Sequence, residues 1–187
     1  MRLLDERLAR EGRKHAMTWE PTKGPIGRLL RSILARETKA HARTIALLYA
    51  ADRNEHVYEP ETGIRERVRR GELVVCDRYV FSSLAYQSIE CGFDYVMALN
   101  SDFPLPQCVI FVDTPVGVCQ ERLAARARPE LYDGTGFQAK VRESYMEVFK
   151  RFEGTGLRIA HVPGDRPAGL VHSEIWKVLD GLPISDM

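Results

Sequence analysis

Two short apolar runs, each ending in an aspartate, constrain the fold of this chain more than any other feature. LVVCD covers Leu73–Asp77, and QCVIFVD covers Gln107–Asp113. Runs of this length that are rich in β-branched residues, with no polar alternation, are typical of strands buried on both faces of a parallel sheet. The same criteria predict further strands at Lys14–Trp19 and Leu157–Val162.

The segments between these runs carry apolar residues at helical spacing. We expect helices in the N-terminal segment that Gly12 ends, and at Gly27–Arg36, Lys39–Val57, Ile64–Arg70, Phe81–Cys91, Val116–Arg126, Phe137–Phe152 and Ala168–Leu179. Alternation of strands and helices predicts a three-layer α/β fold with a parallel sheet. Polar residues at the carboxyl ends of such strands, here Asp77 and Asp113, face the crevice where these folds bind ligands.

Length and charge exclude several classes of protein. A chain of 187 residues predicts a single domain. Its 27 basic and 26 acidic residues leave a net charge of +1, which argues against a nucleic-acid partner. The longest apolar run, Ile45–Ala51, is too short to cross a bilayer, and the N-terminus has no secretory pattern. We therefore expect no membrane partner and a cytoplasmic location. The basic run Arg65–Arg70 contains Glu66 and is typical of a solvated helix face.

The four cysteines form no CxxC pair, and no histidine stands at metal-binding spacing from them. Reduced cysteines and no structural zinc are therefore expected. No Ser-His-Asp or Cys-His set is evident, so the sequence gives no sign of nucleophilic catalysis.

The segment Val75–Gln87, with the sequence VCDRYVFSSLAYQ, combines the end of a buried strand with the start of a helix. Asp77 and Arg78 emerge where a ligand would lie. The guanidinium of Arg78 can contact a phosphate through two parallel hydrogen bonds, and the carboxylate of Asp77 can hold a hydrated Mg²⁺. The alternative is an Asp–Arg pair that only caps the strand.

This segment resembles the signature of the thymidylate kinase family, D-R-[FYH]-x-x-S-x-x-A-[FY], at every fixed position. Three further segments resemble the family in the same order. Thr18–Gly27 contains E-P-x-x-x-x-x-G, Leu47–Arg53 contains [FY]-x-x-x-R, and Glu121–Tyr145 is similar to the arginine-bearing lid and the helix after it. The resemblance extends from Met1 to about Leu182. It implies one domain over residues 1–187 with a P-loop kinase-like fold and a lid at about residues 126–137.

The resemblance also implies a reaction. Enzymes of this family transfer the γ-phosphoryl group of ATP to dTMP, with Mg²⁺, and give dTDP as cytoplasmic homodimers. The catalytic residues would be Arg78, Asp77, Arg126 and Arg128, with Asp77 holding the metal through water. No general base is required, because the phosphate oxygen of dTMP is already an anionic nucleophile.

Six residues would bind dTMP. Tyr49 and Arg53 share one helix face, so that the ring can stack on the base while the guanidinium donates to a carbonyl oxygen. Their alternatives are core packing and a surface ion pair. The remaining four are Ser83 and Gln87 at the base edge, Tyr86 beneath the deoxyribose, and Glu20 near the transferring phosphates, where it would contact substrate or metal-bound water. Tyr86 would exclude a 2′-hydroxyl, and its alternative is a half-buried helix tyrosine.

The sequence departs from the family at two places. It contains no Gly-Lys pair, so the G-x-x-x-x-G-K-[ST] loop that cradles ATP is absent. Met1 aligns with the family's first helix, so a strand and loop of about 15–20 residues is missing, and we expect the complete protein to begin upstream. Trp19 stands where many members have an arginine, which Lys23 or Arg28 could replace. A kinase for another deoxynucleotide and a non-catalytic nucleotide-binding remnant remain alternatives.

Overall fold

The computed structural model describes residues 1–124 and 129–182. The elements in these ranges follow one another as α1 (Arg2–Arg10), β1 (His15–Trp19), α2 (Pro25–Leu34), α3 (Ala42–Tyr58), α4 (Ile64–Arg69), β2 (Leu73–Asp77), α5 (Val80–Tyr86), α6 (Ser88–Cys91), α7 (Phe93–Asn100), β3 (Cys108–Asp113), α8 (Val116–Ala124), α9 (Thr135–Arg151), β4 (Arg158–Pro163) and α10 (Ala168–Asp180). The four predicted strands are therefore confirmed, with bounds that differ by one residue at most.

The strands form two parallel pairs. β1 pairs with β2 in a register that places His15 opposite Leu73, and β3 pairs with β4, with Cys108 opposite Arg158. Parallel pairing is confirmed, and within the described residues β2 and β3 share no ladder. Because each strand has one hydrogen-bonded neighbour, the residues Leu73–Cys76 of β2 are half-buried rather than fully buried.

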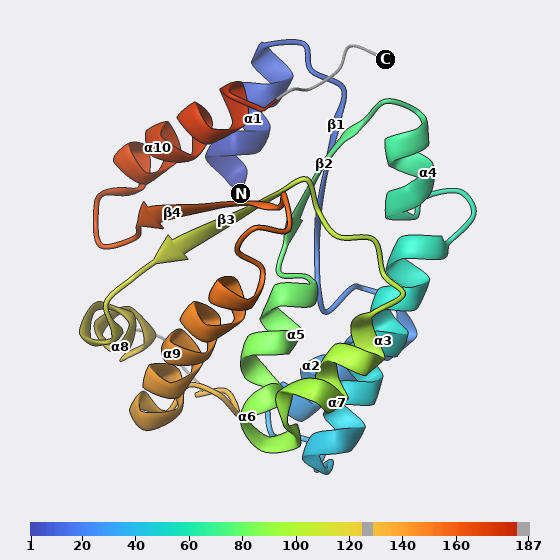
Figure 1. Ribbon diagram of the computed structural model, residues 1–187, viewed down its shortest axis with the longest axis vertical. Coiled ribbons are helices and arrows are strands. Elements are labelled where there is room, and N and C mark those ends of the chain that lie inside the picture. The colour runs from blue at the N-terminus through green and yellow to red at the C-terminus, as the bar shows by residue number, and fades with distance from the viewer. Residues whose placement is uncertain (125–128, 183–187) are drawn as a thin grey trace.

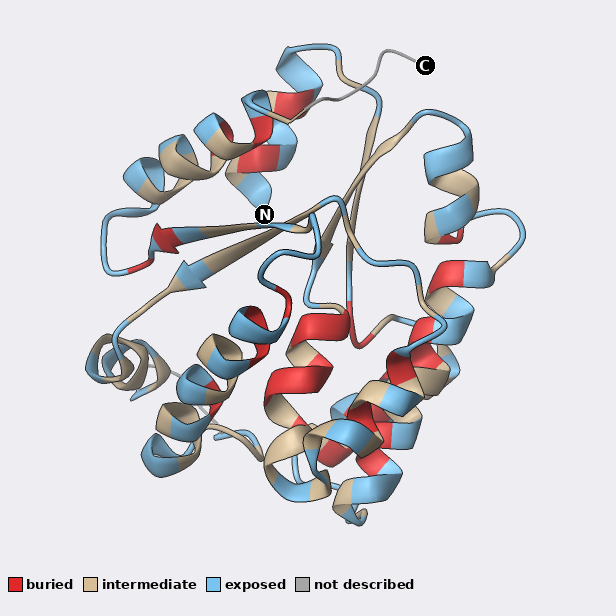
Figure 2. Cartoon of the chain, in the orientation of Figure 1, coloured by how far each residue is buried: buried red, intermediate tan, exposed pale blue. Residues whose placement is uncertain are grey.

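Helices cover the strands on two sides and make three layers (Figure 1). On one side Leu8 of α1 and Trp176 of α10 belong to a cluster that packs against Val75 of β2 and Ile110 of β3. On the other side the cluster formed by α5, α7 and α9 packs against residues on either side of Ile110, including Phe111. Successive side chains of a strand point to opposite faces, so this division confirms the three-layer arrangement. Figure 2 shows that burial is greatest along α5 and the inner faces of α2 and α3.

The helix predicted at Phe81–Cys91 is two helices, α5 and α6, which meet at Gln87. The following helix, α7, was not predicted. Gly92, which has a φ of 84°, separates α6 from α7. Only glycine adopts this backbone conformation at little cost, so Gly92 is the residue that permits the turn. The other predicted helices are present with bounds that differ by a few residues, and α8 is described as far as Ala124.

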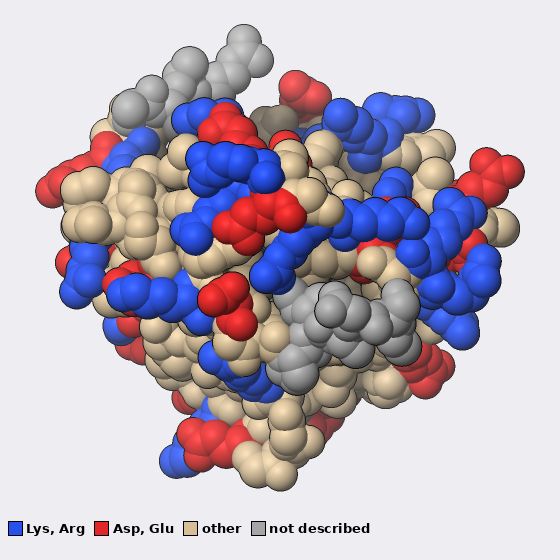
Figure 3. Space-filling model, turned by 90° about the horizontal axis from the view of Figure 1, so that it is seen from above, with Lys and Arg blue, Asp and Glu red and all other residues tan. Residues whose placement is uncertain are grey.

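The basic run of α4 is an ion-paired, exposed surface. Glu66 accepts hydrogen bonds from Arg69 and Arg70 at 2.7 and 2.8 Å, and the contact with Arg69 lowers the pKa of Glu66 to about 2. Figure 3 shows Lys and Arg interleaved with Asp and Glu across the face seen from above. In residues 1–124 and 129–182, no helix has the length and apolar character needed to cross a membrane.

Candidate functional site

The site begins where β2 ends. Arg78 has a φ of 67°, in the left-handed region that residues other than glycine seldom occupy. Such conformations cluster at functional sites, where surrounding contacts hold them. The side chain of Arg78 is exposed, and its guanidinium carbon lies 5.1 Å from the ring centroid of Tyr86 on α5. The backbone turn therefore presents a fixed positive charge directly after the strand.

Tyr49 of α3 faces the same region. Burial raises the pKa of its hydroxyl above the ordinary value, and the positive charge of Arg78 acts in the opposite direction. Tyr86 is also close enough to Tyr49 to influence its titration. The structure thus brings together two aromatic rings and a guanidinium from α3, α5 and the end of β2, a set that can take a planar ring and an anion.

Arg53, one turn further along α3, points into the interior. Its side chain is 1% exposed. Nε and Nη2 donate to Oε2 of Glu20 at 3.0 and 2.7 Å, and Nη2 also donates to Oγ of Ser83 at 3.0 Å. Nη1 donates to Oδ1 of Asn100. The alternative of a surface ion pair for Arg53 is therefore wrong, because the pair with Glu20 is fully buried.

Glu20, directly after β1, is also enclosed. Its side chain is 1% exposed, and its second oxygen, Oε1, lies 3.0 Å from Nδ1 of His56. The other ring nitrogen, Nε2, lies 2.5 Å from Oγ1 of Thr18. Both carboxylate oxygens of Glu20 therefore have protein partners. This placement differs from the expected contact of Glu20 with substrate or metal-bound water, because burial turns the carboxylate toward Arg53.

The loop that carries Glu20 is held by two further contacts. Asp52 of α3 accepts hydrogen bonds from the backbone N–H and the hydroxyl of Thr22 at 2.7 and 2.6 Å. Gly27 of α2 lies so close to the loop that an added Cβ would stand 2.1 Å from the carbonyl oxygen of Thr22. The glycine of the E-P-x-x-x-x-x-G segment is therefore required by close packing, and the aspartate before Arg53 ties α3 to the loop.

A group of aromatic side chains borders the region around Arg78 on another side. Tyr132 and Phe137 stack with ring centroids 4.8 Å apart, and Tyr132 lies 5.7 Å from Tyr86. Burial raises the pKa of Tyr132 to about 12, while a hydrogen bond with the side chain of Gln87 opposes that shift. Leu131 donates its backbone N–H to Leu34 of α2 at 2.8 Å. Residues 129–134 therefore run from α2 to the aromatic group beside α5.

These positions cover part of the predicted lid. Arg126 and Arg128, predicted as its phosphate-binding residues, lie outside the described residues. Sequence reasoning missed Asn100, His56 and Tyr132. The spacing of Phe93, Val96 and Met97 was a signal for α7, which carries Asn100, but nothing in the sequence singled out the other two.

Asp77 is exposed at the carboxyl end of β2, beside Arg78. The described part of the chain has no group of three or more His, Cys, Asp or Glu residues that could hold a metal ion. Mg²⁺ retains several waters and commonly uses only one or two carboxylates together with substrate phosphates. A single exposed carboxylate next to an exposed guanidinium fits that requirement.

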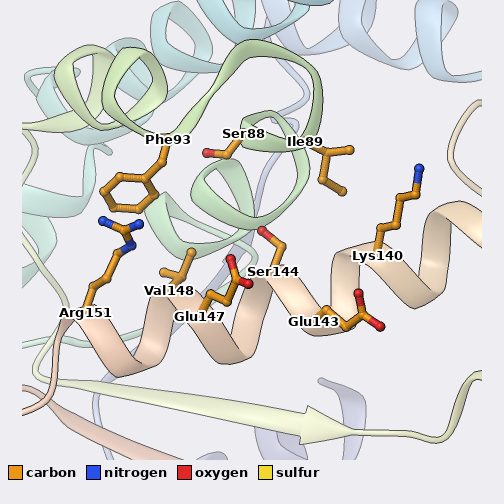
Figure 4. A pocket seen from close by; sticks show the side chains of 9 residues that line it. All are labelled: Ser88, Ile89, Phe93, Lys140, Glu143, Ser144, Glu147, Val148 and Arg151. Atoms are coloured by element: carbon orange, nitrogen blue, oxygen red, sulfur yellow. The ribbon is translucent and has the colours of Figure 1, made fainter.

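A cavity of about 360 Å³ lies elsewhere, between α9 and the α6–α7 region (Figure 4). Arg151 is placed over the ring of Phe93 at 4.3 Å along one side of it, and Lys140 lies at the opposite end. None of the predicted site residues in the described part of the chain lines this cavity. It is therefore separate from the region around Arg78.

The fold and these residues define a nucleotide-binding α/β protein of the kind that transfers phosphoryl groups. The family described as thymidylate kinase matches residues 1–175. A protein of Treponema pallidum that carries the name thymidylate kinase is 38% identical over 161 residues, which cover 84% of this chain and 77% of the relative. One of Aeropyrum pernix with the same name is 37% identical over 166 residues, covering 88% and 78%.

A solved structure of thymidylate kinase from Candida albicans shares the fold. Its TM-score is 0.76 at 21% identity, and the match covers 95% of this chain and 83% of that one. The chain belongs to the thymidylate kinase family, and the prediction of a P-loop kinase-like fold is confirmed.

Proposed function

We propose that this protein is a dTMP kinase, which transfers the γ-phosphoryl group of ATP to the 5′-phosphate of dTMP and releases dTDP and ADP. The observation that carries the proposal is the placement of Arg78. A guanidinium presented after a parallel strand, 5.1 Å from Tyr86 and close to Tyr49, suits a nucleotide that offers both a phosphate and a flat base.

Arg78 and four of the six residues predicted to bind dTMP then contact the nucleotide, whereas the buried Glu20 and Arg53 act through other side chains. Arg78 contacts the 5′-phosphate, and the ring of Tyr49 stacks on the base. Tyr86 lies beneath the deoxyribose and leaves no room for a 2′-hydroxyl. Ser83 and Gln87, four residues apart on the same helical face, read the base edge. Arg53 supports that edge through its hydrogen bond to Ser83.

The chemistry depends on positioning and electrostatics. A phosphate oxygen of dTMP attacks the γ-phosphorus of ATP while ADP leaves on the opposite side, so that no proton must be removed first. Mg²⁺, when bound, neutralises the charge that develops on the phosphate oxygens. Asp77 would hold it through water, and Arg78 keeps the attacking oxygen in place.

We also propose that the protein is a cytoplasmic homodimer. Leu29 of α2 and Leu47 of α3 are large apolar side chains that are 42% and 49% exposed, and α2 packs directly on α3. Exposed apolar residues on neighbouring helices are common at subunit interfaces. Four free cysteines in the described residues suit a reducing compartment. Sedimentation equilibrium tests the dimer, and a monomeric mass at micromolar concentration would contradict it.

The competing candidate is a nucleotide-binding protein that does not transfer phosphoryl groups. The test compares dTMP, dUMP, dCMP and dGMP as acceptors with ATP and Mg²⁺, alongside calorimetric binding of the same nucleotides. We expect dTMP to bind most tightly and to be phosphorylated with the highest kcat/KM. Preference for another nucleotide would refute the proposed substrate, and tight dTMP binding without turnover, even after an upstream P-loop is restored, would establish the non-catalytic candidate.

A further inference from the structure

Behind the proposed base-binding residues lies a buried chain of hydrogen bonds that ends at a histidine with no assigned role. It runs from Thr18 through His56, Glu20 and Arg53 to Ser83, with separations of 2.5 to 3.0 Å at the contacts of its side chains. The side chain of His56 is 9% exposed, and those of Glu20 and Arg53 are 1% exposed. Water therefore has little access to this chain of residues.

The direction of each hydrogen bond follows from the groups involved. An arginine can only donate, so Glu20 and Ser83 both accept from Arg53. Oε2 of Glu20 accepts from Arg53, and its other oxygen lies 3.0 Å from Nδ1 of His56. A carboxylate can only accept, so this contact also needs a donor. Nδ1 of His56 must therefore carry a proton. In the neutral ring Nε2 then accepts from the hydroxyl of Thr18.

The same reasoning determines whether the hydroxyl of Ser83 donates its proton or only accepts. One lone pair of its hydroxyl oxygen accepts from Nη2 of Arg53, and the positive charge of that group disfavours a second approaching N–H. The hydroxyl proton is left to donate. A carbonyl oxygen on the base edge can accept this proton, whereas an exocyclic amino group cannot.

We propose that His56 is a positioning residue which, through Glu20 and Arg53, holds the hydroxyl of Ser83 as a hydrogen-bond donor. The site then binds a base with a carbonyl oxygen at that edge more tightly than a base with an amino group there. The inference rests on the proposed function, because it assumes that Ser83 faces the base of the acceptor. Without His56, one oxygen of Glu20 would be buried without a partner. The carboxylate would reorient to recover a donor, and Arg53 would move with it.

Two substitutions separate the contacts of His56. In His56→Asn the side-chain amide nitrogen can occupy the place of Nδ1 and donate to Glu20, whereas the Thr18 contact is lost. In His56→Gln the amide reaches the place of Nε2 and retains the Thr18 contact, but the donor to Glu20 is lost. If His56 only filled space, glutamine, which is closer in volume to histidine, would restore dTMP binding at least as well as asparagine.

The experiment measures dissociation constants of dTMP and dCMP by calorimetry for the full chain and its variants, which requires no phosphoryl donor. We expect His56→Ala and His56→Gln to weaken dTMP binding about tenfold and to narrow the preference for dTMP over dCMP, and His56→Asn to restore most of both. His15→Ala is the matched control. His15 is 11% exposed and lies on the same strand as Thr18, but it contacts Asp5 and Arg13 instead.

The outcomes distinguish the two proposals. If the unmodified protein binds neither nucleotide, the proposed function fails and this inference fails with it. If it prefers dTMP but His56→Gln matches His56→Asn, or His15→Ala matches His56→Ala, the inference alone is overturned. Nitrogen-15 spectra of the unmodified protein give a test that needs no variant: we expect a protonated Nδ1 on His56, and an unprotonated Nδ1 would overturn the inference.

Discussion

Two arginines of the site differ in what surrounds their guanidinium groups. Arg53 has carboxylate, hydroxyl and amide partners within the protein and is almost fully buried. Arg78 is exposed, its guanidinium lies by the ring of Tyr86, and it forms no ion pair with a carboxylate of the described residues. A guanidinium without a paired carboxylate keeps its donors available to a phosphate. Arg78 is therefore suited to bind a ligand, while Arg53 is suited to hold other side chains in place.

Replacement of Arg78 tests this division. We expect Arg78→Ala to lower kcat/KM for dTMP about 100-fold, because the charge-assisted hydrogen bonds to the phosphate disappear. Thermal unfolding should change little, since the side chain is exposed. Arg69→Ala is a suitable control, because Arg69 is an exposed arginine paired with Glu66 on α4. Near-normal turnover of Arg78→Ala would remove Arg78 from the site.

At the scale of elements, the loop after β1 depends on how closely α2 approaches it. A Cβ on Gly27 would lie 2.1 Å from the carbonyl oxygen and 2.7 Å from the nitrogen of Thr22. Both atoms are backbone, so the loop or the helix must move. We expect Gly27→Ala to destabilise the protein by about 1–3 kcal/mol and to weaken dTMP binding, because the loop positions Glu20.

Gly169 provides the matched control for this prediction. It lies in the first turn of α10, and a Cβ there would have no heavy atom within 4 Å. Gly169→Ala should be neutral or stabilising by up to about 1 kcal/mol, since alanine is the better helix former. Urea unfolding measures both variants. Equal stability of the two would show that α2 can move away from the loop at no cost.

A second link between elements joins β3 to α9. Arg142 donates to both oxygens of Asp113 at 2.7 and 2.8 Å, and these hydrogen bonds lower the pKa of Asp113 below its ordinary value. A carboxyl whose pKa is lower in the folded state stabilises the protein at pH values above its unfolded pKa, about 3.9. That contribution is lost as the pH falls from about 4 through the folded pKa.

Asp113→Asn should therefore be less stable than the unmodified protein at pH 7, and the difference should shrink below about pH 4. Urea unfolding midpoints at pH 7 and pH 3 provide the measurement. In a double-mutant cycle with Arg142→Ala, the coupling at pH 7 should also decrease at pH 3. A difference that stays constant with pH would mean that the pair contributes nothing to the acid dependence.

Sequence patterns predicted the elements better than the contacts between them. The strands were predictable because β-branched runs end at turn residues, and Arg78, Tyr49 and Tyr86 were predictable because a motif carries them. The partners of Arg53 were not predictable from the sequence. Asn100 meets Arg53 only because α7 packs on α3, and His56 meets Glu20 only because α3 lies along the end of β1. Such contacts arise from tertiary packing and leave no local periodicity.

At the scale of the whole molecule, a shared helical layer connects the two strand pairs. The cluster around Leu8 and Trp176 contacts β2 through Val75 and β3 through Ile110, although the two strands share no ladder in the described residues. Within the described residues, apolar packing rather than a shared ladder therefore joins the two strand pairs. One edge of β2 and one edge of β3 are without a strand partner within residues 1–124 and 129–182.

Amide hydrogen exchange of the full chain tests this arrangement. Residues of a parallel strand direct their N–H groups alternately to the two sides. Leu73 donates to Lys14, so the amides of Leu73 and Val75 point toward β1, and those of Val74 and Cys76 point to the open edge. We expect Val74 and Cys76 to exchange about tenfold faster or more, since they lack a strand partner. Uniform protection along Leu73–Asp77 would instead require a hydrogen-bonded neighbour on both sides of β2.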